Sequence, residues 1–286
     1  MTFQVHRVAV IGAGTMGAGI AQATATAGWE THLTDMRPEA IPAALNGIAK
    51  TLEGAVSRGK MTPENRDGIR SRIHSAPSVA EASSNADLVI EAVVEDLRVK
   101  QLVLGEASRV IRGSGLLASN TSSLSIAALA QTLPRPERLV GLHFFNPVHL
   151  MKLVEIVLHT GDDDQSREDA LTVVRALGKE PIVVKDSPGF ASSRLGVVLG
   201  LEAIRMVQQG VASAEDIDRA MELGYNHPMG PLRLTDLVGL DVRLKIAEYL
   251  HATLGDDQYE PPELMRRMVA EGKLGKKSGK GFYQWP

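Results

Sequence analysis

The spacing of apolar and polar residues divides this chain into two parts. Up to about residue 185, short apolar runs of strand length alternate with longer amphipathic segments of helix length. Continuous apolar runs are typical of strands buried on both faces, so the alternation predicts a parallel sheet with helices packed on either side. We therefore expect a doubly wound α/β domain over residues 1–185.

The individual runs give the predicted elements of this domain. Apolar strands are predicted over residues 8–11, 86–94, 115–119, 139–145 and 152–158, and helices over 38–58 and 97–110. Thr62, followed at once by Pro63, has the pattern of a helix N-cap with proline in the first turn. Ser125 is in position to cap the helix that follows the third of these strands.

The pattern changes at Asp186, beyond which only helical signals recur. Residues 190–209 are apolar almost all round the predicted helix, and Ser213 has the pattern of an N-cap for the next one. We expect a smaller all-α domain over residues 186–286. A helix that is apolar on every side must be covered on every side, which favours a homodimer built on this domain; the alternative is a long helix buried within one chain.

Composition limits the class of protein. The 286 residues, 44% of them hydrophobic, suffice for two cores, and a net charge of −3 gives no general attraction to nucleic acid or to an anionic membrane. The absence of cysteine excludes thiolate catalysis and Cys-ligated zinc, and we predict no metal site. No apolar run reaches the roughly 18 residues of a transmembrane helix, and no basic and apolar leader precedes the first strand, so we expect a cytoplasmic protein.

The glycine-rich turn after the first strand carries the first sign of chemistry. The run Gly12-Ala13-Gly14-Thr15-Met16-Gly17 has GxGxxG spacing, and the next apolar run ends at Asp35. In a Rossmann-type turn such glycines allow the tight bend and the close approach of backbone to a pyrophosphate at the helix N-terminus. Asp35 is placed to bind the ribose hydroxyls, which favours NAD, while the neighbouring Arg37 keeps NADP open as the alternative.

A histidine stands where the ligand sites of open α/β sheets occur. His143 lies at the end of an apolar strand, and a hairpin centred on His149 would set Glu155 opposite it on the next strand. A carboxylate on one ring nitrogen fixes the tautomer and raises the basicity of the other, which could then accept a proton from a substrate hydroxyl near neutral pH. The alternative is a buried histidine with only a packing role.

Two polar segments each admit a structural and a functional interpretation. The run Ser119-Asn120-Thr121-Ser122-Ser123 can be a turn before a helix, or it can supply hydrogen-bond donors to a substrate carbonyl at the carboxyl edge of the sheet. The basic residues of the predicted helical pair can form a solvated face or a platform for a phosphorylated substrate. They are Arg58, Lys60, Arg66, Arg70 and Arg72.

Taken together, six ordered motifs resemble one family over nearly the whole chain, the L-3-hydroxyacyl-CoA dehydrogenases. The motifs are the glycine turn, EAVVEDLRVK at 91–100, SNTSS at 119–123, HFFNP at 143–147, HPMGP at 227–231 and KKSGKGFY at 276–283. The resemblance implies a reversible, NAD-dependent oxidation of an (S)-3-hydroxyacyl-CoA of short chain, such as 3-hydroxybutyryl-CoA, to the 3-oxoacyl-CoA. It also implies a dimer whose helical C-terminal domain supplies the subunit contact.

The resemblance assigns roles to three groups of residues. His143 would be the general base and Glu155 its orienting partner, with Ser122 and Asn146 binding substrate and cofactor. Further cofactor contacts would be Glu95, Lys100 and Lys277. Thr51 and Arg58 fall where the family holds the phosphate of CoA, so an acyl-CoA would be the partner of the basic helices.

One expected substrate contact departs from the family pattern, because Ser193 stands where the opening of the C-terminal domain usually has asparagine. The shorter side chain keeps a donor but loses reach, which bears on acyl-chain preference more than on reaction type. Two other functions remain open. One is a dehydrogenase of a free hydroxy acid on the same fold, which needs no CoA platform; the other is a dinucleotide-binding structural protein without turnover.

Overall fold

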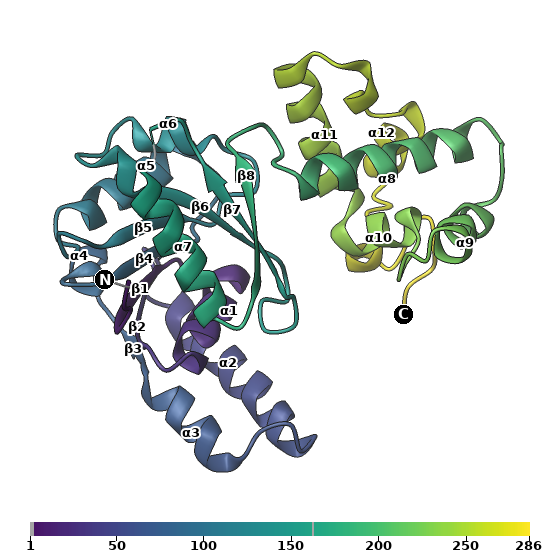
Figure 1. Cartoon of the computed structure of the whole chain (residues 1–286). Helices are drawn as coiled ribbons and strands as arrows, with labels where there is room; N and C mark the ends of the chain where they lie inside the picture. The colour runs from purple at the N-terminus through teal and green to yellow at the C-terminus, as the bar shows by residue number, and fades with distance from the viewer. Residues whose placement is uncertain (1–2, 162) are drawn as a thin grey trace. The chain divides into compact units, whose positions relative to one another are not determined.

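The computed structural model describes residues 3–161 and 163–286, and the chain divides into two compact units (Figure 1). The first unit is Met1–Ser187 and the second is Pro188–Pro286. All the strands of the described chain that join the sheet belong to the first unit, while the second is helical. The predicted combination of a doubly wound α/β fold with a smaller all-α domain is confirmed.

The first unit is built on one sheet, which has eight strands within the described residues, in the order β3-β2-β1-β4-β5-β6-β7-β8. Neighbouring strands run parallel except β6 and β7, which form an antiparallel pair. The chain moves outward from β1 to β3 and returns to place β4 on the other side of β1, which creates the switch point where such sheets bind ligands. The strands are β1 (Arg7–Ile11), β2 (Glu30–Thr34), β3 (Ile73–Ser75), β4 (Leu88–Glu91), β5 (Leu116–Ser119), β6 (Leu139–Phe144), β7 (Leu153–Leu158) and β8 (Glu180–Lys185).

Several helices of the first unit begin at the capping residues that the sequence predicts. The Thr62 hydroxyl accepts the N–H of Asn65 at the start of α3, and the Ser125 hydroxyl accepts that of Ala128 at the start of α6. Helix α1 packs on β1 and β2, and α7 packs on β6, β7 and β8. The helices are α1 (Thr15–Thr26), α2 (Ala40–Ser57), α3 (Pro63–Ser71), α4 (Val79–Ser83), α5 (Leu97–Ser108), α6 (Ile126–Ala130) and α7 (Asp164–Ala176), with a 3₁₀ turn at Pro136–Arg138.

The central strands are apolar because they are covered on both faces. Every residue of β4, β5 and β6 is buried. Three polar residues interrupt this apolar content near the carboxyl ends of the strands: Glu91, Ser119 and His143. Buried polar groups need hydrogen-bond partners, so these three positions direct attention to the carboxyl edge of the sheet.

The second unit packs its helices around a core of its own. Val197, Leu201 and Ile204 of α8 belong to one apolar cluster with Leu232 and Leu250. Helix α9 begins at the predicted cap, Ser213, whose hydroxyl accepts the N–H of Asp216. The helices are α8 (Ser192–Gln208), α9 (Ala214–Gly224), α10 (Pro231–Val238), α11 (Leu240–Leu254) and α12 (Glu263–Ala270), with 3₁₀ turns at Asp257–Tyr259 and Lys276–Ser278.

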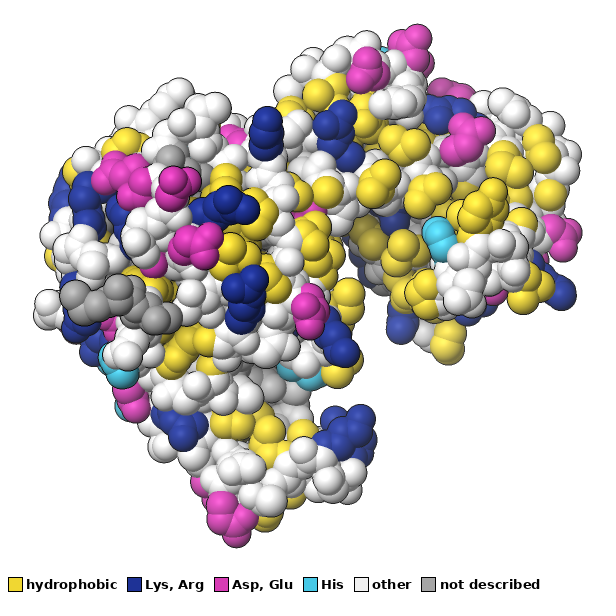
Figure 2. All heavy atoms as spheres, in the orientation of Figure 1, with side chains coloured by type: hydrophobic (Ala, Val, Ile, Leu, Met, Phe, Trp, Pro, Cys, Tyr) yellow, Lys and Arg dark blue, Asp and Glu magenta, His cyan; other side chains and the backbone are white. Residues whose placement is uncertain are grey.

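The apolar residues of helix α8 are only partly covered within one chain, and their cover by a second chain stays a prediction. Its core-facing residues are buried, but Leu195 is 66% exposed and Leu199 is 43% exposed. Hydrophobic side chains also gather on the face of the helical unit that Figure 2 shows. The apolar stretch therefore has a buried face and an exposed face within one chain.

The end of the chain is fixed on one buried carboxylate. Asp236 accepts the backbone N–H groups of Phe282 and Tyr283 and the indole N–H of Trp285. A side chain at Gly281 would collide with this carboxylate, since its Cβ would lie 2.1 Å from Asp236 Oδ1. Along the described chain, the helices are all too short or too polar to cross a membrane.

Candidate functional site

The glycine turn after β1 has the conformation that its spacing predicts. Gly12 has φ +108°, and a Cβ there would lie 2.5 Å from the carbonyl oxygen of Ala92. A Cβ at Gly17 would lie 1.7 Å from the Gly12 carbonyl oxygen, so the first turn of α1 can approach only without a side chain. At Gly14 a Cβ would meet nothing within 4 Å. The turn is therefore tight against the segment that follows β4 and against the start of α1, and it is open above Gly14.

Asp35 supports this turn from the end of β2. Its carboxylate accepts the N–H of Ala13 at 2.7 Å and the N–H of Arg37 at 2.8 Å. The Arg37 guanidinium lies 3.8 Å from the same carboxylate and is largely exposed. An ionised carboxylate has about four acceptor positions, so Asp35 retains capacity for ribose hydroxyls beside the turn.

A groove of about 390 Å³ opens over the turn. Its walls come from the glycine turn, α1, α2 and the loop after β6, and its lining includes Gly14, Thr15, Thr51 and Asn146. The open space above Gly14, the start of α1 and the carboxylate of Asp35 together fit the pyrophosphate and ribose of a dinucleotide. His143 and Ser122 are not among the described residues that line this groove.

His143 and Glu155 form a pair across the antiparallel strands. The register of β6 and β7 places them directly opposite each other, which confirms the pairing predicted from their spacing. His143 Nδ1 lies 2.7 Å from Glu155 Oε2, and the Glu155 side chain is fully buried. An ionised carboxylate only accepts hydrogen bonds, so with Glu155 ionised the ring hydrogen of this contact would be on Nδ1. The ring of Phe145 packs on the imidazole, with 4.6 Å between the ring centroids.

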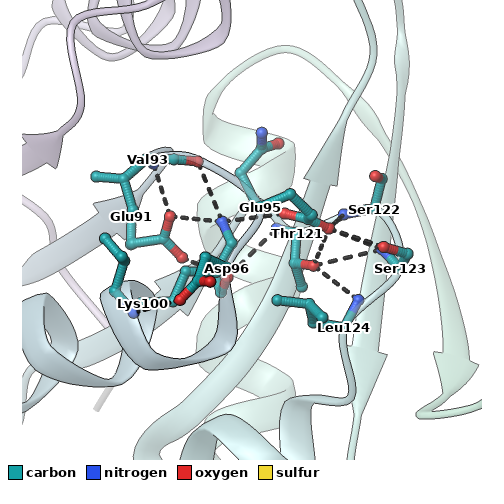
Figure 3. A network of polar contacts seen from close by, with 12 residues as sticks. Glu91, Val93, Glu95, Asp96, Lys100, Thr121, Ser122, Ser123 and Leu124 are labelled. Carbon is teal, nitrogen blue, oxygen red and sulfur yellow. Dashed lines mark hydrogen bonds and ion pairs between the residues drawn. The ribbon is translucent and has the colours of Figure 1, made fainter. Parts of the chain in front are cut away.

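A buried ionic network joins the loops after β4 and β5 (Figure 3). Lys100 Nζ donates to Glu91 Oε1 at 2.7 Å and lies 3.2 Å from Glu95 Oε2. The second oxygen of Glu91 accepts the Ser119 hydroxyl at 2.6 Å. Glu91 and Lys100 are almost completely buried, so this pair is shielded from solvent at the ends of the two strands.

Glu95 extends the network to the polar loop after β5. Its Oε1 accepts the hydroxyls of Thr121 and Ser123 and the backbone N–H groups of Ser122 and Ser123, as Figure 3 shows. Burial raises the pKa of Glu95, but the Lys100 ammonium and these hydroxyls outweigh it and hold the pKa below its ordinary value. Glu95 is therefore ionised and fixes the conformation of residues 121–123.

Glu95 and Lys100, the two predicted cofactor residues of this network, differ in how far they are exposed. Glu95 keeps a partly exposed side chain, whereas the side chain of Lys100 is only 1% exposed. The Lys100 ammonium has three oxygen neighbours, on Glu91, Glu95 and the Val93 carbonyl. Lys100 thus lies behind the loops, where it holds them, rather than on their surface.

The remaining predicted residues are distributed over both units. Thr51 lines the groove from α2, with its hydroxyl bonded to the Gly47 carbonyl, and Arg58 ends the same helix on the exposed surface. Ser193 and Lys277 belong to the second unit, in the first turn of α8 and in the last 3₁₀ turn. The Lys277 ammonium pairs there with Asp241 at 2.5 Å.

The basic helical pair is partly neutralised by its own carboxylates. Arg66 forms ion pairs with Glu53 and Asp67, and Arg72 donates to the carbonyl of Ala25. The structure therefore favours the interpretation as a solvated face for Arg66 and a packing role for Arg72. Arg58 has no ion pair within the described residues.

Sequence reasoning missed the buried residues that connect the loops. Glu91 and Ser119 stand out in the sequence only as parts of motifs, and Asn120, whose side-chain oxygen accepts the N–H of Phe144 at 2.9 Å, ties the loop after β5 to β6. The signal available in the sequence was Glu91, a carboxylate inside the apolar run at 88–94. A buried charge requires a partner, so this residue indicates a buried network.

The comparisons with known proteins agree over the whole chain. Residues 7–187 match the family model described as 3-hydroxyacyl-CoA dehydrogenase, NAD binding domain, and residues 189–285 match that of the 3-hydroxyacyl-CoA dehydrogenase C-terminal domain. The chain is 44% identical to 3-hydroxybutyryl-CoA dehydrogenase of Mycobacterium tuberculosis, with all of both chains covered. It is 42% identical to a probable 3-hydroxybutyryl-CoA dehydrogenase of Bacillus subtilis, covering 99% of this chain and 98% of that one.

A solved structure is similar in both fold and sequence. The crystal structure of (S)-3-hydroxybutyryl-CoA dehydrogenase from Ralstonia eutropha superposes with a TM-score of 0.94 at 38% identity, covering 99% of this chain and 100% of that chain. Identity of this level over full length, together with the two family models, identifies the relationship. The chain therefore belongs to the 3-hydroxyacyl-CoA dehydrogenase family and carries its NAD-binding domain.

Proposed function

We propose that this chain catalyses the NAD-dependent, reversible oxidation of an (S)-3-hydroxyacyl-CoA of short chain, such as 3-hydroxybutyryl-CoA, to the 3-oxoacyl-CoA. The observation that carries the proposal is the pair of His143 and Glu155 at the carboxyl edge of a sheet whose glycine turn fits a dinucleotide. The names of the full-length relatives support the substrate class. NAD supplies the hydride acceptor when it is bound.

His143 accepts the proton of the substrate hydroxyl in the direction of oxidation and returns it in the reverse direction. The Nδ1–H bond to Glu155 leaves Nε2 as the nitrogen that exchanges this proton. The buried carboxylate stabilises the imidazolium that forms during the transfer. Glu155 thus acts through His143 as its positioning partner.

The loop after β5 holds the reacting oxygen. Its conformation is fixed by Glu95, which leaves the Ser122 hydroxyl available as a donor near the strand ends. Asn146, in the groove beside Gly14, supplies an amide to the cofactor or the acyl group. Lys100 and Glu91 keep the two loops in place from their buried positions.

The proposal also includes contacts for the CoA portion of the substrate and a second copy of the chain. Thr51, in the groove wall, and the exposed Arg58 on the same helix support a phosphate contact on α2. Ser193 and Lys277, which belong to the second unit, are further proposed ligand contacts. The exposed apolar residues of α8 support a homodimer formed through that unit.

The test compares substrates with and without CoA. Wild-type protein should oxidise NADH rapidly with acetoacetyl-CoA and much more slowly with free acetoacetate. Only acetoacetyl-CoA carries the CoA phosphate that the residues on α2 are proposed to bind. Replacing NADH by NADPH in the same assay measures cofactor preference. Equal rates with acetoacetyl-CoA and acetoacetate would reject the CoA assignment and favour a dehydrogenase of free hydroxy acids. No rate with either would favour a binding protein without turnover.

A further inference from the structure

Lys179 is a buried lysine that the proposed reaction does not use. It stands between α7 and β8, and it is 9% exposed. Its Nζ donates to the carbonyl oxygens of Val148 at 2.6 Å and Met151 at 2.8 Å. Both carbonyls belong to the loop between β6 and β7, which also carries Asn146.

The burial of the Lys179 ammonium is unusual because this charge has no counter-ion among the described residues. Within residues 3–161 and 163–286, no carboxylate forms an ion pair with Lys179. Burial accordingly lowers the pKa of its amino group. Methionine has a similar length and would avoid the cost of removing a charge from water. What lysine adds at this position is the pair of hydrogen bonds to backbone carbonyls.

The same loop also packs on α1. Val148 is 2% exposed, and a Cβ at Gly19 would lie 2.8 Å from the Val148 side chain. Glycine at this position therefore lets the loop approach the helix that begins at the dinucleotide turn. Val148 is fixed by its side chain on α1 and by its carbonyl on Lys179.

These two contacts bear directly on the groove above the glycine turn. Asn146, Pro147, Val148 and His149 line that groove, together with Thr51 of α2. A loop that links two strands has many accessible conformations unless its backbone groups are bonded. Lys179 removes this freedom at two carbonyls, one on Val148 and one on Met151.

We propose that Lys179 is a positioning residue for the active site, which sets the place of Asn146 in the groove by bonding the carbonyls of Val148 and Met151. The proposal rests on the proposed function for the role of Asn146, and it adds a residue outside the site. Lys179 acts only through the loop and touches neither substrate nor cofactor. Its loss should therefore matter only while Asn146 is present.

A double-mutant cycle tests this dependence. Lys179→Met should lower kcat/KM for acetoacetyl-CoA by about ten- to a hundredfold, the range expected for a misplaced contact group. In the Asn146→Ala background the same substitution should change kcat/KM by less than about twofold, because the group that it positions is gone. Lys152→Met, which removes an exposed lysine of the same loop, should leave the rate unchanged.

Other outcomes overturn the proposal. If Lys179→Met lowers the rate by the same factor with and without Asn146, or lowers only the melting temperature, its role is purely structural. If Lys179→Met does not fold, the cycle is run with Lys179→Gln, whose donor is one atom shorter and cannot span both carbonyls. If wild-type protein does not turn over acetoacetyl-CoA, the proposed function fails, and the cycle is read from the Kd for NADH instead.

Discussion

At the scale of single residues, three carboxylates of similar chemistry serve different ends because their surroundings differ. Glu155 is fully buried and bonded to one imidazole nitrogen, where it would orient the proposed base. Glu95 accepts several donors from one loop and fixes its shape. Asp35 remains partly exposed at the end of β2 and supports the glycine turn through the N–H of Ala13. Position in the fold, more than residue type, assigns each role.

Asp35 gives the first prediction at this scale. Asp35→Ala should reduce the preference for NADH over NADPH by about tenfold or more, because the repulsion between the carboxylate and a 2′-phosphate is removed. It should also weaken binding of both cofactors, since Ala13 loses its acceptor. The measurement is kcat/KM for each cofactor at a fixed acetoacetyl-CoA concentration.

Asp35→Asn is the matched control for this prediction. It removes the charge but keeps a side-chain oxygen for the N–H of Ala13. The asparagine variant should therefore show the altered preference with less loss of NADH binding than the alanine variant. An unchanged preference in both variants would mean that Asp35 is not the ribose contact.

At the scale of elements, much of the arrangement follows from local sequence. The structure confirms the apolar strand runs, the caps at Thr62, Ser125 and Ser213, and the register of His143 with Glu155. These features depend on residues close in sequence or on the two-residue period of a hairpin. They could be inferred without knowing how the rest of the chain folds.

The features that the sequence did not predict depend on how side chains from different elements meet in the folded chain. The burial of Lys100 follows from its meeting with Glu91 and Glu95, and the pairing of Arg66 with Glu53 follows from the packing of α3 on α2. The bonds of Lys179 to the loop after β6 join residues about 30 apart. A charge in the sequence does not reveal whether its partner will be a ligand or another part of the chain.

The loops joined by Glu95 should show a defined dependence of stability on pH. The folded-state pKa of Glu95 lies below its ordinary value of 4.5, so the group stabilises the fold above about pH 4.5 and loses this contribution as pH falls through the lower value. Glu95→Gln should therefore have a smaller free energy of unfolding than wild type at pH 7, and the difference should shrink below pH 4.5. Urea unfolding of both proteins from pH 7 to pH 3.5 measures this difference.

An exposed carboxylate on α7 provides the control. Glu168→Gln should give a difference from wild type that is small at every pH, because its carboxylate lies on the surface. If the deficit of Glu95→Gln is the same at pH 7 and pH 3.5, the ionised carboxylate does not hold the loop. The network in Figure 3 would then be packing without net electrostatic stabilisation.

At the scale of the whole molecule, the helical unit carries exposed apolar side chains on neighbouring helices. They are Leu195 and Leu199 of α8, Leu234, Leu237 and Val238 of α10, and Val242 of α11. Helices α8, α10 and α11 pack on one another. Exposed apolar side chains on adjoining elements are typical of interaction surfaces, which is the physical support for a homodimer.

Light scattering with size-exclusion chromatography tests the dimer. Wild-type protein should have twice the 30.7 kDa mass of one chain, and Leu195→Glu with Leu199→Glu should shift it toward a monomer. Leu102→Glu, at an exposed apolar residue of the first unit, should leave the mass unchanged. A monomeric wild type at micromolar concentration would reject the dimer and leave the exposed face of α8 with another partner.

In the proposed mechanism His143, oriented by Glu155, moves the hydroxyl proton in an NAD-dependent dehydrogenase. The most direct test measures kcat with acetoacetyl-CoA and NADH for wild type and His143→Gln, alongside the Kd for NADH by fluorescence. We expect a kcat lower by about 10² to 10⁴ with the Kd for NADH nearly unchanged, since glutamine cannot exchange the proton. An undiminished kcat in the variant would contradict the mechanism.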